Sequence, residues 1–171
     1  MDFSREEYSK HYIVQALFLL MRQYEYENIS VTDIVKKAGV GRATFYRYFK
    51  SKVDVITFYF EHNKNKFVIE QRFRPRCKED YYEIALRVLN VFRQNKEPFR
   101  LLRRAHLDSI YLDYLNRNFR NMFSENFPNA SVYAPYIYAG MLYNLSMAWL
   151  DNDCAESPES LASIIIETVL Q

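Results

Sequence analysis

The stretch from Ile29 to Lys52, ISVTDIVKKAGVGRATFYRYFKSK, constrains the fold more than any other part of this chain. Ser30 and Asp33 have the spacing of a capping box, which predicts the start of a first short helix. The apolar residues that follow recur at helical spacing up to Ala38. Gly39 comes directly afterwards and suits the left-handed residue that ends a helix.

A second short helix is predicted from about Arg42 to Tyr48, with Gly41 as an acceptable N-cap. Phe45 and Phe49 lie four residues apart, so they share one face and anchor this helix in the core. The opposite face carries Arg42, Ala43, Tyr46 and Arg47. Two short helices that meet at a glycine-containing turn, the second rich in Arg, Thr and Tyr, are typical of a helix-turn-helix that binds DNA.

Positive charge is concentrated in the same stretch. Residues 30–52 hold six Lys and Arg against one acid, a net charge of +5, whereas the whole chain carries only +2. Such a patch on a nearly neutral protein is typical of a surface that binds nucleic-acid phosphates. Ser51 and Asp54 repeat the capping spacing and place Lys52 in the first turn of the next helix.

These residues resemble the DNA-binding domain of the TetR/AcrR family of one-component regulators. The matching positions are Asp33-Ile34, Ala38-Gly39-Val40, the run from Thr44 to Phe49, and Lys52. The motif covers about residues 3–55, and beyond it the resemblance is one of helical layout. The family often has a polar residue where Gly41 stands, a departure that would remove one phosphate or cap contact.

The resemblance implies a role for each residue that matches the motif. Arg42, Ala43 and Tyr46 would meet base edges, with Arg42 suited to a bidentate contact with guanine. Thr32 would contact a base or a phosphate. Phosphate contacts are implied for Thr44, Arg47, Tyr48 and Lys52, assisted by the dipole of the helix that starts at Lys52. A solvated charged face without a ligand is the alternative interpretation.

The remaining sequence also predicts helices, and three Gly and five Pro are too few for sheets with many tight turns. Further helices are expected at about residues 5–24, 52–72, 78–94, 98–105, 108–123, 135–150 and from 158 onward, with a loop at 74–76. We therefore expect an all-α fold of about nine helices. The resemblance divides it into a helix-turn-helix DNA-binding domain, residues 1–51, and a helical regulatory and dimerisation domain, residues 52–171.

The last two predicted helices are apolar over too wide an arc for surface helices. The uncharged segment 126–150 is interrupted by Tyr, Asn and Ser, which favours a buried or interface helix over a membrane span. In the family, these two helices form a four-helix bundle across a two-fold axis, which implies a homodimer. Gly140 and Ala148 would allow close approach of neighbouring helices. One large intramolecular core is the alternative.

The resemblance further implies a repressor that an unknown small-molecule effector releases from a palindromic double-stranded DNA operator. Aromatic and neighbouring residues of the carboxy-terminal domain are the pocket candidates, although an aromatic stripe at helical spacing equally serves as core. They are Phe92, Phe99, His106, Tyr111, Tyr114, Phe119, Tyr138 and Met141. With Asp108 or Asp113 nearby, such a pocket would suit a lipophilic cation.

Other classes of protein are disfavoured. Two distant Cys and three scattered His give no disulfide framework, no metal site and no catalytic arrangement, so no enzyme and no cofactor is expected. The charged amino terminus is not a signal peptide, which favours the cytoplasm. Two alternatives remain: an adaptor of the same fold that acts through protein–protein contacts without its own operator, and a nonspecific DNA-coating protein.

Overall fold

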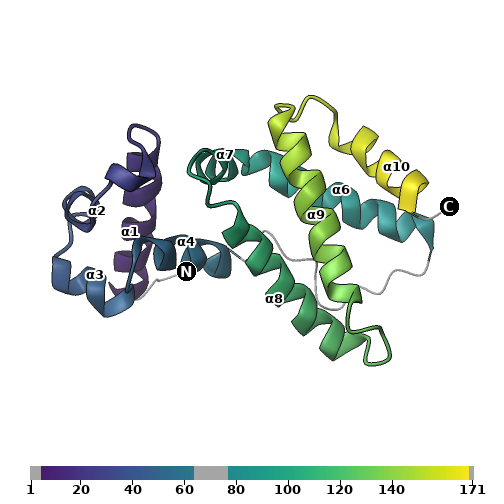
Figure 1. Ribbon diagram of the computed structural model, residues 1–171, viewed down its shortest axis with the longest axis horizontal. Coiled ribbons are helices and arrows are strands. Elements are labelled where there is room, and N and C mark those ends of the chain that lie inside the picture. Colours follow the sequence, from purple (N-terminus) through teal and green to yellow (C-terminus); the bar gives the residue numbers. More distant parts are fainter. Residues whose placement is uncertain (1–4, 64–76, 170–171) are drawn as a thin grey trace. The chain divides into compact units, whose positions relative to one another are not determined.

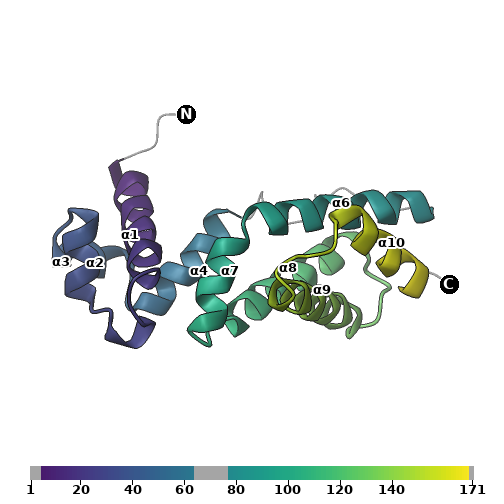
Figure 2. The same ribbon diagram turned by 90° about the horizontal axis from the view of Figure 1, so that it is seen from above.

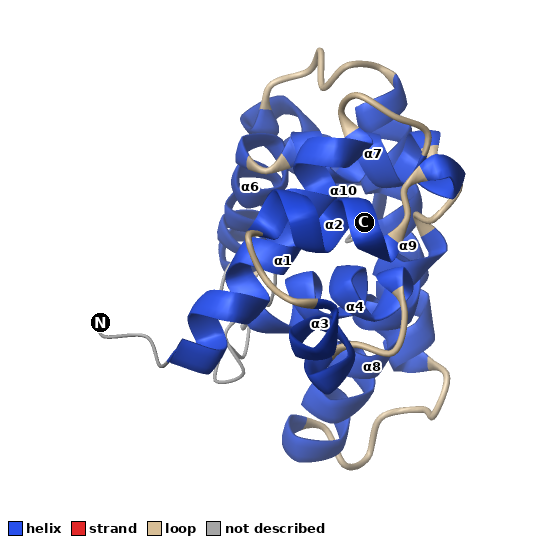
Figure 3. Ribbon diagram, turned by 90° about the vertical axis from the view of Figure 1, so that its left-hand side faces the viewer, coloured by secondary structure: helices blue, strands red, loops and turns tan. Residues whose placement is uncertain are grey.

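The computed structural model describes residues 5–63 and 77–169, which form nine α-helices, one 3₁₀ helix and no strand (Figure 1). Figure 3 shows the same part of the chain coloured by secondary structure, with helices joined only by loops. The prediction of an all-α fold is confirmed. The elements are α1 (Arg5–Met21), η1 (Tyr26–Asn28), α2 (Val31–Ala38), α3 (Arg42–Tyr48), α4 (Lys52–His62), α6 (Lys78–Gln94), α7 (Lys96–Arg104), α8 (Ser109–Asn126), α9 (Ala134–Asp151) and α10 (Pro158–Val169).

Helix bounds agree with the predictions to within one residue at most positions and differ by more at three. α8 ends at Asn126, past the predicted end at residue 123. α1 ends at Met21, before the predicted end at residue 24. α7 begins at Lys96, ahead of Pro98, because a proline in the first helical turn sacrifices no intrahelical hydrogen bond. The predicted continuation of α4 to residue 72 and the loop at 74–76 lie outside the described residues.

The chain divides into two compact units, which we call the head and the body. The head comprises Met1–His62 and Leu101–Asp108, and the body comprises Asn63–Arg100 and Ser109–Gln171. α4 and the end of α7 therefore belong to the same unit as the helix-turn-helix.

A contact from Arg104 explains why the end of α7 belongs to the head. Its guanidinium donates a hydrogen bond to the carbonyl oxygen of Met21 and lies 3.5 Å from that of Tyr24. α1 has no basic residue in its own last turn. A cation near a helix carboxyl end is stabilising, so Arg104 supplies to α1 the charge that its own sequence lacks.

The head is built around α1, which packs against α2, α3 and α4. Its buried apolar side chains come from all four helices: Ile13, Leu17, Met21, Ile34, Phe45, Val55, Ile56 and Phe60. This core fixes which face of α3 remains in solvent.

Local capping fixes the helix ends of the head. The predicted capping box of α2 is present, because the Ser30 hydroxyl accepts from the Asp33 amide at 3.2 Å and the Asp33 carboxylate accepts from the Ser30 amide at 2.9 Å. Gly39 ends α2 in the left-handed region with φ 69°, as predicted. At α4, the Asp54 carboxylate accepts the amides of Lys50 and Ser51 at 2.7 and 3.0 Å.

The body contains two helix pairs, α8 with α9 and α6 with α10, together with the start of α7 (Figure 2). α10 begins as predicted, with Pro158 at its first position and the Ser157 hydroxyl accepting from the Ser160 amide at 3.1 Å. None of the described helices is both long enough and apolar enough to span a membrane.

Candidate nucleic-acid interface

α3 has one buried face and one exposed face, as the sequence predicted. Phe45 and Phe49 are 0% and 3% exposed, and their rings contact each other at a centroid distance of 5.8 Å. On the other side, Arg42 and Ala43 are exposed, and 52% of Tyr46 is exposed although its ring leans edge-on against Phe45. The packing of α3 therefore presents a charged and aromatic surface to solvent.

The six cations of residues 30–52 separate into two groups. Lys36, Lys37, Arg42, Arg47 and Lys50 are all exposed. Within the described residues, none of these five side chains forms an ion pair. Exposed cations without an ion-pair partner are the ones from which phosphates can displace counterions.

Three further predicted contact residues occupy different environments. Thr32, in the first turn of α2, is exposed, whereas Thr44 and Tyr48 are half-buried. The Tyr48 ring lies under the Lys10 ammonium, 5.0 Å from the ring centroid, and Lys10 also pairs with Glu6 at 2.6 Å. The contact from α1 orients Tyr48, and no local sequence pattern indicated it.

Lys52 forms the second group by itself. Its ammonium donates hydrogen bonds to the carbonyl oxygens of Tyr26 and Ile29 at 2.6 and 2.7 Å. The same nitrogen lies 4.1 Å from the centroid of the Tyr26 ring. Burial lowers the pKa of Lys52 below its ordinary value. The structure thus directs this side chain into the head, whereas the sequence had placed it among the phosphate contacts.

The amino terminus of α4 was also expected to attract phosphate, and it is already occupied. The Asp54 carboxylate accepts the two amides that precede the helix and offsets the positive end of its dipole. At the start of α4 the Lys52 ammonium and the amides of Lys50 and Ser51 are therefore already engaged, and the exposed cations of α2, of α3 and at Lys50 constitute the positive surface.

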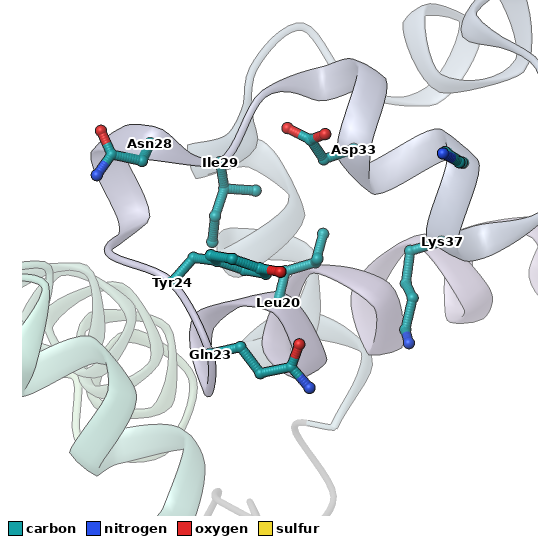
Figure 4. Close-up of a pocket in the computed structure, with 8 residues that line it drawn as sticks. Leu20, Gln23, Tyr24, Asn28, Ile29, Asp33 and Lys37 are labelled. Atoms are coloured by element: carbon teal, nitrogen blue, oxygen red, sulfur yellow. The ribbon is translucent and has the colours of Figure 1, made fainter.

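A cavity of about 610 Å³ also opens in the head, between the end of α1, η1 and α2 (Figure 4). Its lining residues are Leu20, Gln23, Tyr24, Asn28, Ile29, Asp33, Lys36 and Lys37. None of them comes from α3, and the Asp33 carboxylate is engaged with Ser30. The cavity is therefore separate from the exposed face of α3.

Most of the predicted effector-pocket residues lie buried in the body as parts of continuous aromatic contacts. Phe92 contacts Phe99 at a centroid distance of 4.5 Å, and Phe99 contacts Tyr111 at 4.7 Å. Tyr114 is buried like these three residues, and its ring stacks with that of Tyr111. Burial raises the pKa of the Tyr111 phenol, which lies beside the Ser146 hydroxyl. We call these four rings the aromatic chain.

The other pocket candidates lie elsewhere. Phe119 is buried against Tyr138, with ring centroids 6.1 Å apart, and Met141 is half-buried on α9. His106 is exposed and belongs to the head. It adopts φ 53° in the turn after α7, where its amide donates to the Arg103 carbonyl oxygen. His106 therefore belongs to a different unit from the aromatic chain.

Two family descriptions match this chain. Residues 13–57 match bacterial regulatory proteins of the tetR family, and residues 79–171 match a transcriptional regulator C-terminal region. Together the matches cover well over half of the chain. A chain with this all-helical fold and exposed helix-turn-helix surface belongs to the TetR family of transcriptional regulators, which confirms the resemblance inferred from the sequence.

Individual relatives are distant. The uncharacterized HTH-type transcriptional regulator YxbF of Bacillus subtilis (strain 168) is 25% identical over 179 residues, covering 93% of this chain and 44% of YxbF. The chain spans less than half the length of the curated relatives that it matches.

Solved structures share the fold at low identity. Lin0861 from Listeria innocua has a TM-score of 0.81 at 21% identity, covering 100% of this chain and 96% of that one. NalD, described as the secondary repressor of the MexAB-OprM multidrug efflux pump in Pseudomonas aeruginosa, has a TM-score of 0.56 at 16% identity, covering 96% and 95%.

Proposed function

We propose that this regulator binds a palindromic DNA operator as a homodimer and represses transcription until a small molecule releases it. The observation that carries the proposal is the surface of α3, where Phe45 is fully buried while Arg42 and Tyr46 face solvent. A helix anchored by one face and exposed on the other is what entry into a major groove requires. The protein acts in the cytoplasm, where a bacterial chromosome lies.

The proposed contacts follow the exposure of the side chains. Arg42 pairs with a guanine edge, and Ala43 and Tyr46 contact neighbouring bases. Thr32, Thr44, Arg47 and Tyr48 contact phosphates or the adjacent backbone, which sets the register of α3 in the groove. The other exposed cations add to the sequence-independent attraction. Lys52 is left out of this set because its ammonium is engaged inside the head.

A homodimer is supported by the surface of α9. Ile137 is 67% exposed and Tyr133, which precedes the helix, is 71% exposed. Gly140, Asn144 and Ala148 continue the same face at helical spacing, and the last two are exposed. A Cβ added to Gly140 meets no atom within 4 Å. An exposed face of apolar and small residues suits a second copy of α9, and the family resemblance adds α10 to the interface. A two-fold dimer supplies the two heads that a palindrome needs.

Release by an effector is proposed for the body. The aromatic chain gives the body a large apolar interior with phenol groups, which is the composition of small-molecule sites in proteins. The repressor assignment follows NalD, which shares the fold and is described as a repressor. An effector would act only through a difference in its affinity for the DNA-bound and released conformations.

Selection of binding sites from random duplex DNA tests the proposal. The purified protein is compared with Arg42→Ala at physiological salt. We expect a two-fold symmetric motif, and in the variant a loss of preference at one position per half-site, corresponding to about 1–3 kcal/mol.

Two results would contradict the proposal. Enrichment of no motif by the wild-type protein would favour the adaptor that acts through protein–protein contacts. Retention of DNA without sequence preference, with a steep dependence on salt, would favour the nonspecific DNA-binding alternative.

A further inference from the structure

Lys52 lies where two distant segments of the head meet. It stands in the first turn of α4, while its two hydrogen-bond acceptors, the carbonyl oxygens of Tyr26 and Ile29, belong to η1 and to the residue after it. Ile29 is 3% exposed and directly precedes Ser30, the N-cap of α2. The contact therefore connects the start of α4 to the start of α2.

This connection closes a loop of chain that contains the whole helix-turn-helix. Between Tyr26 and Lys52 the chain forms α2, the turn at Gly39 and α3, and it then passes into α4. Without Lys52, α4 is joined to this segment by the short connection after α3, where the Phe49 ring contacts Phe58 of α4, and by packing on α1. With Lys52, the segment is held at both of its ends.

The chemistry of the contact suits a fixed structural joint. An ammonium that donates to two carbonyl oxygens forms charge-assisted hydrogen bonds, which are stronger than neutral ones. The Tyr26 ring adds a cation–π contact at 4.1 Å. A phosphate would have to compete with all three partners for the same ammonium.

We propose that Lys52 is a positioning residue for DNA recognition rather than a phosphate contact. By closing the loop, it holds α2 and α3 in a fixed orientation on α4, so that both helices follow any movement of α4. The inference rests on the proposed DNA binding, but the closure itself is a property of the head alone and can be tested without DNA.

The first experiment measures the closure through stability. Lys52→Met is compared with Lys50→Met, which removes the same charge two residues away from an exposed side chain. We expect Lys52→Met to raise the unfolding constant of the head about tenfold, because two charge-assisted hydrogen bonds are lost, and Lys50→Met to change it less than about twofold. Equal effects of the two variants would overturn the closure.

A double-mutant cycle identifies the partner. Tyr26→Leu removes the aromatic face, and Tyr26→Phe retains it. Lys52→Met should cost less in the Tyr26→Leu background than in the wild type or in the Tyr26→Phe background. Additive effects of Lys52→Met and Tyr26→Leu would show that the ring takes no part and would overturn that element of the joint.

The second experiment separates positioning from contact. The affinity for the selected operator is measured over a series of salt concentrations, at a temperature where each variant is fully folded. We expect Lys52→Met to weaken binding at least about fivefold while the slope of log affinity against log salt stays at the wild-type value. Arg47→Met, which removes a proposed phosphate contact, should lower that slope by about one.

Each remaining outcome is informative. A slope lowered by about one in Lys52→Met would make this residue a phosphate contact and overturn the inference. Unchanged operator affinity of the folded Lys52→Met variant would overturn the positioning role and leave Lys52 with a role in stability alone. If the wild-type protein binds no DNA, the proposed function fails, while the stability comparison still decides whether the loop is closed.

Discussion

The head and the body both bury apolar side chains, but they leave different surfaces uncovered. The head exposes Arg42, Arg47 and three lysines around α2 and α3. The body exposes Tyr133, Ile137 and their neighbours on α9. Exposed cations suit a polyanion, and an exposed apolar face suits another protein surface. This difference is the basis for proposing that the head binds DNA and that the body binds a second copy of the chain.

The two surfaces also differ in how their binding energy depends on conditions. Contacts between exposed cations and phosphates weaken steeply as salt increases, because they are driven by counterion release. Burial of an apolar face contributes roughly 25 cal/mol per Å² and is insensitive to moderate salt. Dimerisation should therefore persist at salt concentrations that release the operator. Substitutions in each unit test whether the head and the body are distinct in stability and in association.

The largest effects should come from the two cores. Phe45→Ala in the head and Phe99→Ala in the body each remove a ring that is at most 1% exposed, at a cost of about 3–5 kcal/mol. Trp149, the single tryptophan, lies in the body 6.1 Å from Phe92. In urea unfolding, Phe45→Ala should shift the circular-dichroism transition ahead of the tryptophan-fluorescence transition.

Phe99→Ala is the matched control for this measurement. It should shift the fluorescence transition of Trp149 to lower urea. If both variants shift both probes equally, the head and the body unfold as one cooperative unit, and the comparison between them applies to their surfaces but not to their stability.

A substitution at Gly140 should have the next largest effect, and on the body alone. A Cβ at this position meets no atom of the same chain within 4 Å. A leucine side chain would occupy the space needed by a partner helix and cost about 1–3 kcal/mol of association, roughly five- to 150-fold in the dimer constant. Analytical ultracentrifugation at a series of concentrations measures the change. Unchanged dimerisation of Gly140→Leu would place the interface elsewhere.

Gly140→Ala provides the control. Alanine has a higher helix propensity than glycine by about 1 kcal/mol, so this variant should unfold at higher urea. Its single methyl group should disturb association far less than the leucine side chain does. The pair therefore separates the stability of α9 from the contact that α9 makes.

The sequence predicted the local structure of the head because its signals are local. Ser30 with Asp33, and Gly39 after Ala38, act within one helical turn, and the structure confirms both. The closure by Lys52 was not predictable, because its acceptors lie 23 and 26 residues away along the chain. The cation–π contact of Lys10 with the Tyr48 ring was not predictable for the same reason, because it joins α1 to α3. Helical periodicity indicated which face of α3 is exposed, whereas only the fold shows which side chains are engaged by distant segments.

In the body, helical periodicity correctly predicted where α6 begins and ends. It could not show which roles the aromatic residues of the body have. Phe92, Phe99 and Tyr111 have the same sequence pattern whether they fill a core or line a pocket, and the structure places them in continuous contact. His106 looked similar to them in sequence, but it belongs to the head. Side-chain function in the body depends on long-range packing, for which the sequence has no short-range signal.

Helix caps provide a smaller test of the two units. Ser30→Ala in the head removes a hydroxyl that both accepts from the Asp33 amide and donates to its carboxylate, and Ser157→Ala in the body removes one accepted hydrogen bond. We expect costs of about 1–2 kcal/mol and about 0.5 kcal/mol, respectively. Circular dichroism and Trp149 fluorescence in urea measure them. Equal costs would mean that the reciprocal bond at Ser30 adds nothing.

The smallest expected effect is a pH dependence of the head. Hydrogen bonds from Ser30 hold the pKa of the Asp33 carboxyl below its ordinary value. Because the folded-state pKa is the lower one, the stabilisation is present at neutral pH and is lost as the pH falls from about 4 through the folded-state pKa. Other carboxyl groups titrate over the same range, so the wild-type protein must be compared with Asp33→Asn, in which they are unchanged. The difference in urea midpoint between the two proteins should be constant above pH 5 and should shrink on acidification. A difference that stays constant down to pH 3 would show that the charge of Asp33 contributes nothing beyond the hydrogen bonds that asparagine can also accept.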